Sequence, residues 1–328
     1  MTRQNNRIKP SEITPEEVFI NRRKVVAGAM AMGLLPGCQG DATAAVIPDS
    51  GELLAWEGST SERLTPEAAA SNHNNYYEFG QRKEDPARYA HTLVTEPWSI
   101  EVTGEADRLG TYTLEDILAP HALEERIYRL RCVERWSMVI PWAGFPMADL
   151  LARFEPRSSA KYVQFFTLAD PEQMPGLRDP IISWPYLEGL TIEEAMHPLT
   201  FAAVGVYGKV LPNQNGAPIR LVVPWKYGYK SIKSIVRIHF TDEKPRITTE
   251  SRLGGDWTWQ TAWNEYAGHE YGFYSNVNPD RAHPRWSQQV EQRLDGRFPE
   301  QVLETQLFNG YAEEVADLYR GLDLVRNH

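Results

Sequence analysis

Residues 124–146 read EERIYRLRCVERWSMVIPWAGFP, and Cys132 lies in the middle of this stretch. The sequence has only two cysteines, and the other, Cys38, lies in a segment typical of an export signal. A single thiol in an exported protein cannot form an intrachain disulfide, so it is either buried and inert or takes part in chemistry. Two arginines and a glutamate lie within three residues of Cys132. They favour a thiolate in an electropositive setting, or one bound to a metal, over a cysteine that packs as a small apolar residue.

Strand and helix patterns follow one another irregularly along the chain. Apolar alternation predicts strands, whereas Thr or Pro before an acidic or apolar turn predicts short helices. The expected strands cover residues 98–103, 162–167, 219–224 and 235–240, and the expected helices cover 113–118, 146–153 and 191–196. This order favours an α+β fold over a regular βαβ winding. No G-x-G-x-x-G motif or P-loop supports nucleotide binding.

The N-terminal segment has the parts of an export signal. Basic residues 21–24, NRRK, precede the apolar, small-residue-rich stretch 25–35, and residues 42–44, ATA, form an A-x-A cleavage pattern. The paired arginines favour the twin-arginine route. The apolar stretch is shorter than the roughly 20 residues that span a membrane. Residues 35–38, LPGC, offer an alternative in which Cys38 carries a lipid anchor.

These patterns divide the chain into three parts. We expect residues 1–44 to be a twin-arginine signal peptide that is removed, which places the protein in the periplasm. Residues 45–73 are small-residue-rich and charged, so we expect an extended linker or wrapping segment there. Residues 74–328 are expected to form a single domain, since this length can bury a substantial core.

A basic segment stands out from an otherwise acidic chain, whose formal net charge is −10. The absence of a long basic tract argues against nucleic-acid binding. Four cations nevertheless fall within 14 residues that follow an Asn-Gly turn: Arg220, Lys226, Lys230 and Lys233. Such a cluster either binds a phosphate or another polyanion, or forms a solvated loop face. Interleaved Trp225, Tyr227 and Tyr229 favour a folded site, in which Trp225 or Tyr227 either shapes a substrate mouth or packs in the core.

The combination of a thiolate and an anion-binding loop indicates an oxidoreductase with an anionic metal cofactor. The histidines are scattered, which argues against an all-protein metal cage, and no G-x-S-x-G elbow marks a serine hydrolase. One protein thiolate, with the other ligands supplied by a cofactor, fits molybdenum on a dithiolene pterin. Ligand softness supports this choice without selecting molybdenum by itself.

Seven stretches resemble the molybdopterin-dependent catalytic subunit of bacterial periplasmic protein-methionine-sulfoxide reductases, in the sulfite-oxidase-fold group. They span residues 74–324 and read NNYYEFG, EERIYRLRCVERWSMVIPWAGFP, EAMHPLTFAAVGVYGK, QNGAPIRLVVPWKYGYKSIKSI, EYGFYSNVNP, HPRWSQ and LFNGYAEEVADLYRGLDL. The resemblance implies a sulfite-oxidase-like molybdopterin-binding fold of the α+β class, with mixed sheets and short helices. It also implies a molybdenum-molybdopterin cofactor.

The same resemblance implies roles for particular residues. Cys132 would be the thiolate bound to molybdenum. Glu134 would hydrogen-bond near the metal or supply protons, or else pair with a neighbouring arginine. The residues that would contact molybdopterin are Asn74, Tyr77, Glu78, Thr167, Asn215 and Arg220, with Ser231, Ile232 and Lys233 at its phosphate end. The family commonly has Gly at the position of Ser231, a change that a backbone contact should survive.

The implied reaction is oxygen-atom transfer from methionine sulfoxide in oxidised periplasmic proteins, which restores methionine. The electrons would come from a membrane haem b subunit that draws on the quinone pool or on flavin. This chain has no haem C-x-x-C-H motif and no iron–sulfur cysteines, which itself predicts a partner. Two alternatives stay open: a sulfite oxidase-type enzyme that runs the transfer in the opposite direction, and a non-enzymatic exported binding protein with a structural cysteine.

Overall fold

The computed structural model describes residues 53–248, 272–283 and 285–327. The expected signal peptide, residues 1–44, and the alternative lipid site at Cys38 lie outside the described residues.

The strands are β1 (Leu54–Ala55), β2 (Ser99–Gly104), β3 (Gly110–Thr113), β4 (Glu124–Arg131), β5 (Trp136–Pro146), β6 (Tyr162–Thr167), β7 (Leu187–Thr191), β8 (Phe201–Val206), β9 (Lys209–Val210), β10 (Arg220–Val222), β11 (Ile235–Thr241), β12 (Val290–Arg293) and β13 (Gln301–Glu304). The α-helices are α3 (Glu67–Asn72), α4 (Asp85–Tyr89), α5 (Leu114–Leu118), α6 (Met147–Ala152), α7 (Ile192–Ala195) and α9 (Ala312–Val315). Short 3₁₀ turns are η1 (Tyr77–Phe79), η2 (Ala90–Thr92), η3 (Pro175–Arg178), η4 (Asn213–Asn215), η5 (Gly228–Lys230), η7 (Leu307–Gly310) and η8 (Ala316–Tyr319).

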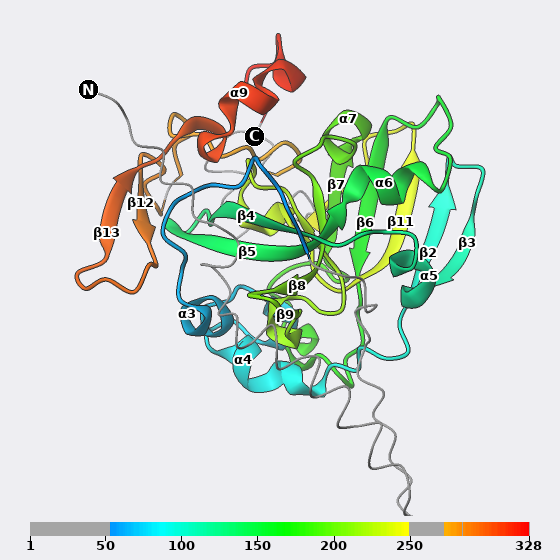
Figure 1. Cartoon of the computed structure of the whole chain (residues 1–328), viewed down its shortest axis with the longest axis horizontal. Helices are drawn as coiled ribbons and strands as arrows, with labels where there is room; N and C mark the ends of the chain where they lie inside the picture. The colour runs from blue at the N-terminus through cyan, green and yellow to red at the C-terminus, as the bar shows by residue number, and fades with distance from the viewer. Residues whose placement is uncertain (1–52, 249–271, 284, 328) are drawn as a thin grey trace, which may run out of the picture.

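The described strands form two mixed sheets. The larger has eight strands in the order β1-β4-β5-β12-β13, with β8 paired to β5 and both β9 and β10 paired to β8. The second has five strands in the order β3-β2-β11-β6-β7. Parallel pairs, such as β11 with β2, occur beside antiparallel pairs, such as β4 with β5. In Figure 1, β4 and β5 cross the middle of the molecule, the five-stranded sheet lies to their right, and the β12–β13 hairpin projects on the left.

The elements expected from the sequence are present with small changes at their ends. Strand β6 occupies the expected range, and β11 runs one residue further than expected. Helices α5 and α7 begin directly after Thr113 and Thr191, and both threonines form a reciprocal capping box with the residue three positions on. The α+β class with mixed sheets and short helices is therefore confirmed. The segment before residue 74 also contains helix α3, which the sequence did not suggest, and Ala70 of α3 belongs to the hydrophobic core.

The β4–β5 hairpin places Cys132 because its connection is only four residues long, 132–135. The Cys132 N–H donates to the Trp136 carbonyl at 2.9 Å, and the Arg135 N–H donates to the Cys132 carbonyl at 3.1 Å. Arg135 closes the turn in the left-handed region, with φ of 80°. Strand β5 is buried along nearly its whole length, which fixes the base of the hairpin in the core. The thiol is therefore carried on a short, well-anchored turn.

A glycine allows two other segments of the future site to approach each other. Gly216 follows η4 with φ of 101°, as the Asn-Gly pattern predicts. A Cβ atom at this position would lie 2.7 Å from Cβ of Lys233. Only glycine therefore lets the η4 turn pack directly on the segment that follows η5.

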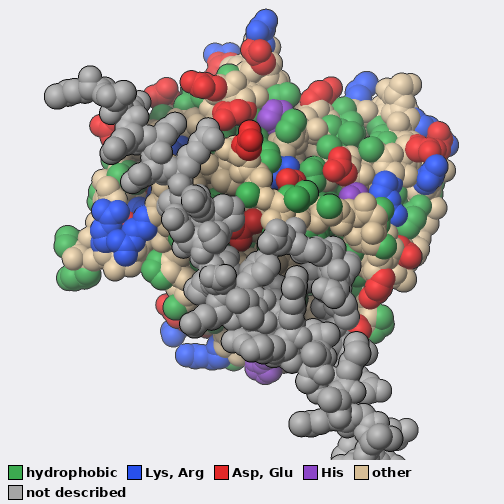
Figure 2. Space-filling view, viewed as in Figure 1, with side chains coloured by type: hydrophobic (Ala, Val, Ile, Leu, Met, Phe, Trp, Pro, Cys, Tyr) green, Lys and Arg blue, Asp and Glu red, His purple; other side chains and the backbone are tan. Residues whose placement is uncertain are grey.

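The surface of the described part is charged and carries no membrane-spanning helix. Figure 2 shows Asp and Glu side chains spread over much of the visible face, in keeping with the net charge of −10. Among the described residues, no helix has both the length and the apolar character needed to cross a membrane.

Candidate functional site

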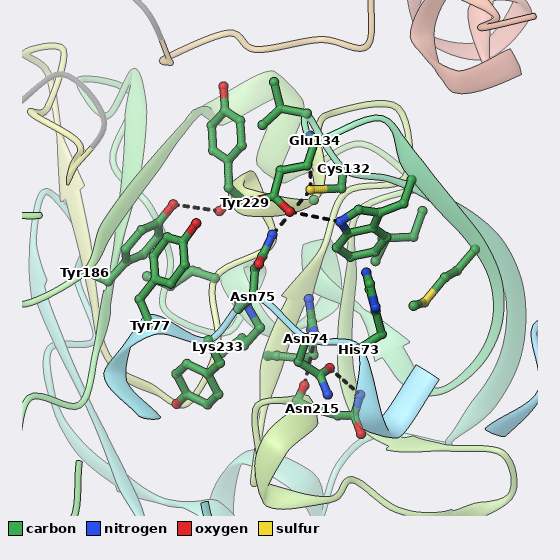
Figure 3. Close-up of a pocket in the computed structure, with 18 of the residues that line it drawn as sticks. His73, Asn74, Asn75, Tyr77, Cys132, Glu134, Tyr186, Asn215, Tyr229 and Lys233 are labelled. Atoms are coloured by element: carbon green, nitrogen blue, oxygen red, sulfur yellow. Dashed lines mark hydrogen bonds between the residues drawn. The ribbon is translucent and has the colours of Figure 1, made fainter. Parts of the chain in front are cut away.

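Three segments that are distant in the sequence meet at one cavity, with a free volume of about 1300 Å³ that extends to solvent. They are the chain from α3 into η1, the β4–β5 turn, and the stretch from η4 to the residues after η5. All predicted site residues except Ser231 line this cavity: Asn74, Tyr77, Glu78, Cys132, Glu134, Thr167, Asn215, Arg220, Ile232 and Lys233. In Figure 3, Cys132 and Glu134 lie at one end of the cavity, and Asn74 and Asn215 lie at the other.

Cys132 is a buried thiol with donors directed at its sulfur. Its exposed fraction is 6%, and its Sγ accepts hydrogen bonds at 3.4 Å from the Asn75 side-chain amide and from the Glu134 N–H. Burial, and then the negative charge of Glu134, raise the pKa of the thiol to about 12. Without a bound metal the group is therefore a neutral thiol, and a metal ion would be needed to hold it as a thiolate.

The positive charges near the thiol are outweighed: burial and Glu134 raise the pKa of Cys132 more than Lys83 and Arg131 lower it. Arg131 is fully buried, and its guanidinium donates to the carbonyls of Cys132 and Val290 and lies 3.5 Å from Glu291. Its main contacts therefore anchor the hairpin to β12. Of the two readings offered by the sequence, the environment of Cys132 favours metal binding.

Glu134 faces the cavity and pairs with a lysine instead of a neighbouring arginine. Its Oε2 lies 2.5 Å from the Lys83 ammonium and accepts from the Trp136 indole at 3.0 Å. Burial disfavours the charged carboxylate, but these two partners, together with a hydrogen bond from the Asn75 side chain, outweigh burial and lower the pKa of Glu134. At neutral pH, Glu134 is therefore an ionised hydrogen-bond acceptor beside the sulfur of Cys132.

The other end of the cavity is positively charged. Arg220 is buried, and its three hydrogen bonds go to the backbone carbonyls of Asn215, Ser231 and Leu221. Burial lowers its pKa to about 10. Burial and the repulsion from Arg220 also lower the pKa of Lys233, whose ammonium donates to the Asn75 carbonyl at 2.9 Å. Two cations close together, with backbone carbonyls as their main partners, form a place for an anion.

The two remaining cations of the basic segment do not take part in this site. Lys226 lies 2.5 Å from Glu194, and Lys230 lies 2.5 Å from Glu188, with all four side chains almost completely buried. They are therefore neither anion ligands nor a solvated loop face, because each is neutralised by its own carboxylate. Trp225 is also buried, and its indole donates to the Tyr319 hydroxyl at 2.7 Å, so it packs in the core.

Ser231 is placed differently from the sequence expectation. Its N–H donates to the Gly228 carbonyl at 3.1 Å, and its hydroxyl accepts from the Val223 N–H at 3.0 Å. Its carbonyl accepts from Arg220, so Ser231 orients that guanidinium from behind the cavity wall. Thr167 does line the cavity, and its hydroxyl donates to the Lys233 carbonyl at 2.9 Å.

Several lining residues were not singled out from the sequence. Asn75 belongs to the NNYYEFG stretch, so that stretch could have suggested it. Tyr186 comes from the segment before β7, and its hydroxyl hydrogen-bonds Glu188 and the Tyr229 carbonyl. His283 and Trp286 line the cavity with stacked rings 4.8 Å apart. They lie in the HPRWSQ stretch, which the resemblance includes without naming any residue.

The residues present fit a molybdopterin. Asn215 Oδ1 is buried without a hydrogen-bond partner, although its amide nitrogen donates to Ala70 and Asn74, so one acceptor faces the cavity unused. The Arg220–Lys233 end calls for an anion, and the Cys132 end offers a soft sulfur ligand. Among the described residues, no group of three or more His, Cys, Asp or Glu side chains could hold a metal ion.

Comparison with known proteins agrees with this arrangement. Residues 88–248 match the family model described as the oxidoreductase molybdopterin binding domain, and this domain's cofactor is molybdenum-molybdopterin. The protein-methionine-sulfoxide reductase catalytic subunit MsrP of Burkholderia mallei is 52% identical over 97% of this chain and 94% of its own length. The corresponding subunits of Pseudomonas syringae pv. tomato and Ralstonia nicotianae are 47% and 50% identical over 98% and 97% of this chain, and 97% and 95% of their own lengths.

One solved structure, the sulfane dehydrogenase SoxCD from Paracoccus pantotrophus, aligns with 49% of this chain and 41% of its own. Its sequence identity of 19% and TM-score of 0.39 are too low to assign a function. The near full-length matches instead decide the family. With its cysteine-bearing hairpin, its cationic cavity and these relatives, the chain belongs to the MsrP family of protein-methionine-sulfoxide reductase catalytic subunits, which are molybdopterin-dependent oxidoreductases of the sulfite-oxidase-like α+β fold.

Proposed function

We propose that this protein reduces methionine sulfoxide residues in periplasmic proteins, with Cys132 as the protein ligand of molybdenum. The single observation that carries the site assignment is that Cys132 Sγ and the cations Arg220 and Lys233 line the same cavity. Bound there, molybdenum-molybdopterin would supply the two-electron oxygen-atom-transfer chemistry. Per turnover, the sulfoxide S–O bond breaks, two electrons and two protons are consumed, and methionine and water are formed.

The residues of this chain divide the work between them. Arg220 and Lys233 would hold the phosphate end of the cofactor, and Asn215 Oδ1 would accept from an N–H of the pterin. Asn74, Glu78, Thr167 and Ile232 complete the wall around it, while Ser231 holds Arg220 in place.

Other residues that line the cavity would handle the substrate and its protons. Glu134, which is ionised, accepts hydrogen bonds next to the sulfur of Cys132. Burial raises the pKa of Tyr77, so its hydroxyl stays protonated and can donate to a sulfoxide oxygen. Tyr77, Tyr186 and Tyr229 gather on one side in Figure 3. Aromatic rings there suit the thioether of methionine, since sulfur–aromatic contacts are favourable.

The electron donor is proposed to be a membrane haem b subunit that draws on the quinone pool. The relatives are named as catalytic subunits, which supports a separate electron-supplying partner. Periplasmic location by twin-arginine export is supported by the NRRK stretch at residues 21–24 and the ATA pattern at residues 42–44. Lipid attachment at Cys38 is the less favoured processing.

The test is the molybdenum content of protein purified after native export, measured by elemental analysis on the wild type and on Cys132→Ser. We expect about one molybdenum per wild-type chain, together with reduction of methionine sulfoxide in an oxidised protein. Cys132→Ser should keep its far-ultraviolet circular dichroism spectrum and lose reductase activity, because serine does not replace a soft thiolate ligand.

Three results would count against the proposal. A Cys132→Ser variant with full activity would remove the ligand assignment. Preferred turnover of sulfite over methionine sulfoxide by the wild type would instead identify a sulfite oxidase-type enzyme. A molybdenum-free wild type that is folded and active would remove the cofactor chemistry altogether.

A further inference from the structure

A lysine behind the cavity wall connects the two groups that surround the sulfur of Cys132. Lys83 does not line the cavity, and its side chain is 24% exposed. Its ammonium lies 2.5 Å from Glu134 Oε2 and also donates to Asn75 Oδ1. Its backbone carbonyl accepts from the Asn74 N–H at 3.0 Å. Lys83 is therefore held in place by its main chain and by its side-chain contacts with Asn75 and Glu134, the two residues that hydrogen-bond to the thiol sulfur.

The contact with Lys83 decides which way the Asn75 amide faces. A lysine ammonium can only donate hydrogen bonds, whereas an asparagine amide has one accepting and one donating end. Because Oδ1 is held by Lys83, Nδ2 is turned towards Cys132 and lies 3.4 Å from Sγ. In the opposite orientation, two donors would meet at Lys83, and an oxygen would face the sulfur. Lys83 thus makes Asn75 a hydrogen-bond donor to the thiol sulfur (Figure 3).

The same ammonium balances the charge of Glu134. The Glu134 N–H donates to Sγ at 3.4 Å, and its carboxylate is only 13% exposed. A thiolate on Cys132 would place a second negative charge beside that carboxylate in a setting of low solvent exposure. The positive charge of Lys83 reduces this repulsion.

We propose that Lys83 is a positioning residue that sets the hydrogen bonding to the Cys132 sulfur through Asn75 and Glu134. The inference rests on the proposed function, because it concerns Cys132 as the ligand of molybdenum. N–H donors to a thiolate ligand withdraw electron density from the sulfur and thereby raise the reduction potential of the metal. Without Lys83, Asn75 Oδ1 loses its donor and Glu134 loses its positive partner, so the sulfur becomes more electron-rich and the potential falls.

The experiment compares purified, molybdenum-loaded wild type with Lys83→Met and Lys83→Arg. The potential is measured by redox titration followed by electron paramagnetic resonance, and kcat and KM are measured with an oxidised protein substrate. Lys83→Met should lower the molybdenum potential and reduce kcat by roughly 10-fold or more, the range known for residues that orient a metal ligand. KM should stay within about twofold, because Lys83 does not line the cavity. Lys83→Arg keeps a donor-only cation and should restore the potential and most of kcat.

Two controls separate positioning from a general effect on the fold. Lys209→Met removes the same kind of side chain from an exposed pair with Glu67, at 2.7 Å, and should leave the potential and kcat unchanged. In an Asn75→Ala/Glu134→Gln background, Lys83 has neither partner to hold and keeps only its direct charge effect on Cys132, so adding Lys83→Met should move the potential much less than it does in the wild type.

A wild-type potential in Lys83→Met overturns the inference, as does an equal shift in the background that lacks both partners. If Lys83→Met binds no molybdenum, Lys83→Arg decides: a wild-type potential there supports positioning, and loss of molybdenum there as well overturns it. Failure of the proposed function is distinguishable, because it would appear as a wild type that itself contains no molybdenum.

Discussion

At the scale of single residues, His283 shows how a neutral side chain can hold the rim of the cavity. Its Nδ1 accepts hydrogen bonds from the N–H groups of Arg285 at 3.2 Å and Trp286 at 3.1 Å. Burial, and then the positive charges of Arg281 and Arg285, lower its pKa to about 4. Protonation of Nδ1 would remove the acceptor from both N–H groups, so this turn requires the neutral ring.

We predict that acid weakens this turn between pH 6.5 and about 4. A histidine whose pKa is lowered on folding leaves stability intact above pH 6.5, and that stability is lost as the pH falls through this window. The loss should be on the order of 1 kcal/mol, since the ring is half-exposed and solvent screens the charges. Urea unfolding across this window should show a weaker pH dependence for His283→Asn, because an asparagine oxygen can accept the same N–H groups without titrating.

The matched control for this prediction is His91→Asn, which changes an exposed histidine that does not line the cavity. It should keep the pH dependence of the wild type. An unchanged pH dependence in His283→Asn would show that the rim turn does not rely on the neutral ring.

At the scale of elements, helix α7 is joined to the segment around Lys226 through Glu194. One carboxylate oxygen accepts from the Thr191 N–H at 3.0 Å and completes the capping box. The other lies 2.5 Å from the Lys226 ammonium and accepts from the Tyr319 hydroxyl at 2.6 Å. A single side chain therefore starts the helix and neutralises a fully buried cation.

Glu194→Gln is predicted to destabilise the protein by about 3–5 kcal/mol, because it leaves Lys226 buried without a negative partner. Burial already lowers the pKa of Lys226 to about 8, so the variant should also release a proton from this lysine near neutral pH. The free energy of unfolding in guanidinium chloride is the measurement.

Glu193→Gln changes an exposed carboxylate in the same helical turn and should stay within about 0.5 kcal/mol of the wild type. Similar losses in both variants would contradict the role given to the buried pair.

These elements show what could be predicted from the sequence. The start of α7 was predictable because a capping box is a contact between residues three positions apart. The partner of Lys226 was not, since the pairing of β6, β7 and β11 brings Glu194 and Lys226 together from distant parts of the chain. The same holds for the site: Cys132 and the other predicted residues that line the cavity followed from motifs and from the family resemblance, whereas Lys83 and Tyr186 acquire their contacts only in the folded structure.

At the scale of the whole molecule, the segment before α3 closes one edge of the larger sheet. Strand β1 pairs with β4, the Thr60 N–H donates to the Ile127 carbonyl at 3.0 Å, and the Thr65 N–H donates to the Val139 carbonyl at 3.0 Å. Glu62 in this segment contacts Arg129 of β4 and lies 2.5 Å from Arg293 of β12. The carboxylate thus links this segment to β4 and β12. These two strands lie on either side of β5, the strand that follows the Cys132 turn.

Glu62→Gln is predicted to lower the free energy of unfolding at pH 7 by about 1.5–3 kcal/mol, the range for a hydrogen bond to a charged group. Burial raises the pKa of Glu62, but Arg129 and Arg293 outweigh burial, so its pKa lies below the usual value of 4.5. A carboxylate with a lowered pKa contributes stability above pH 4.5 and loses it as the pH falls through the folded-state pKa. The difference between wild type and variant should therefore shrink as urea unfolding is carried from pH 7 to below pH 4.5.

Glu67→Gln, which loses only the exposed pair with Lys209, should differ little from the wild type at any pH. A gap between Glu62→Gln and wild type that stays constant with pH would mean that packing of the segment, and not the charge of Glu62, closes the edge of the sheet.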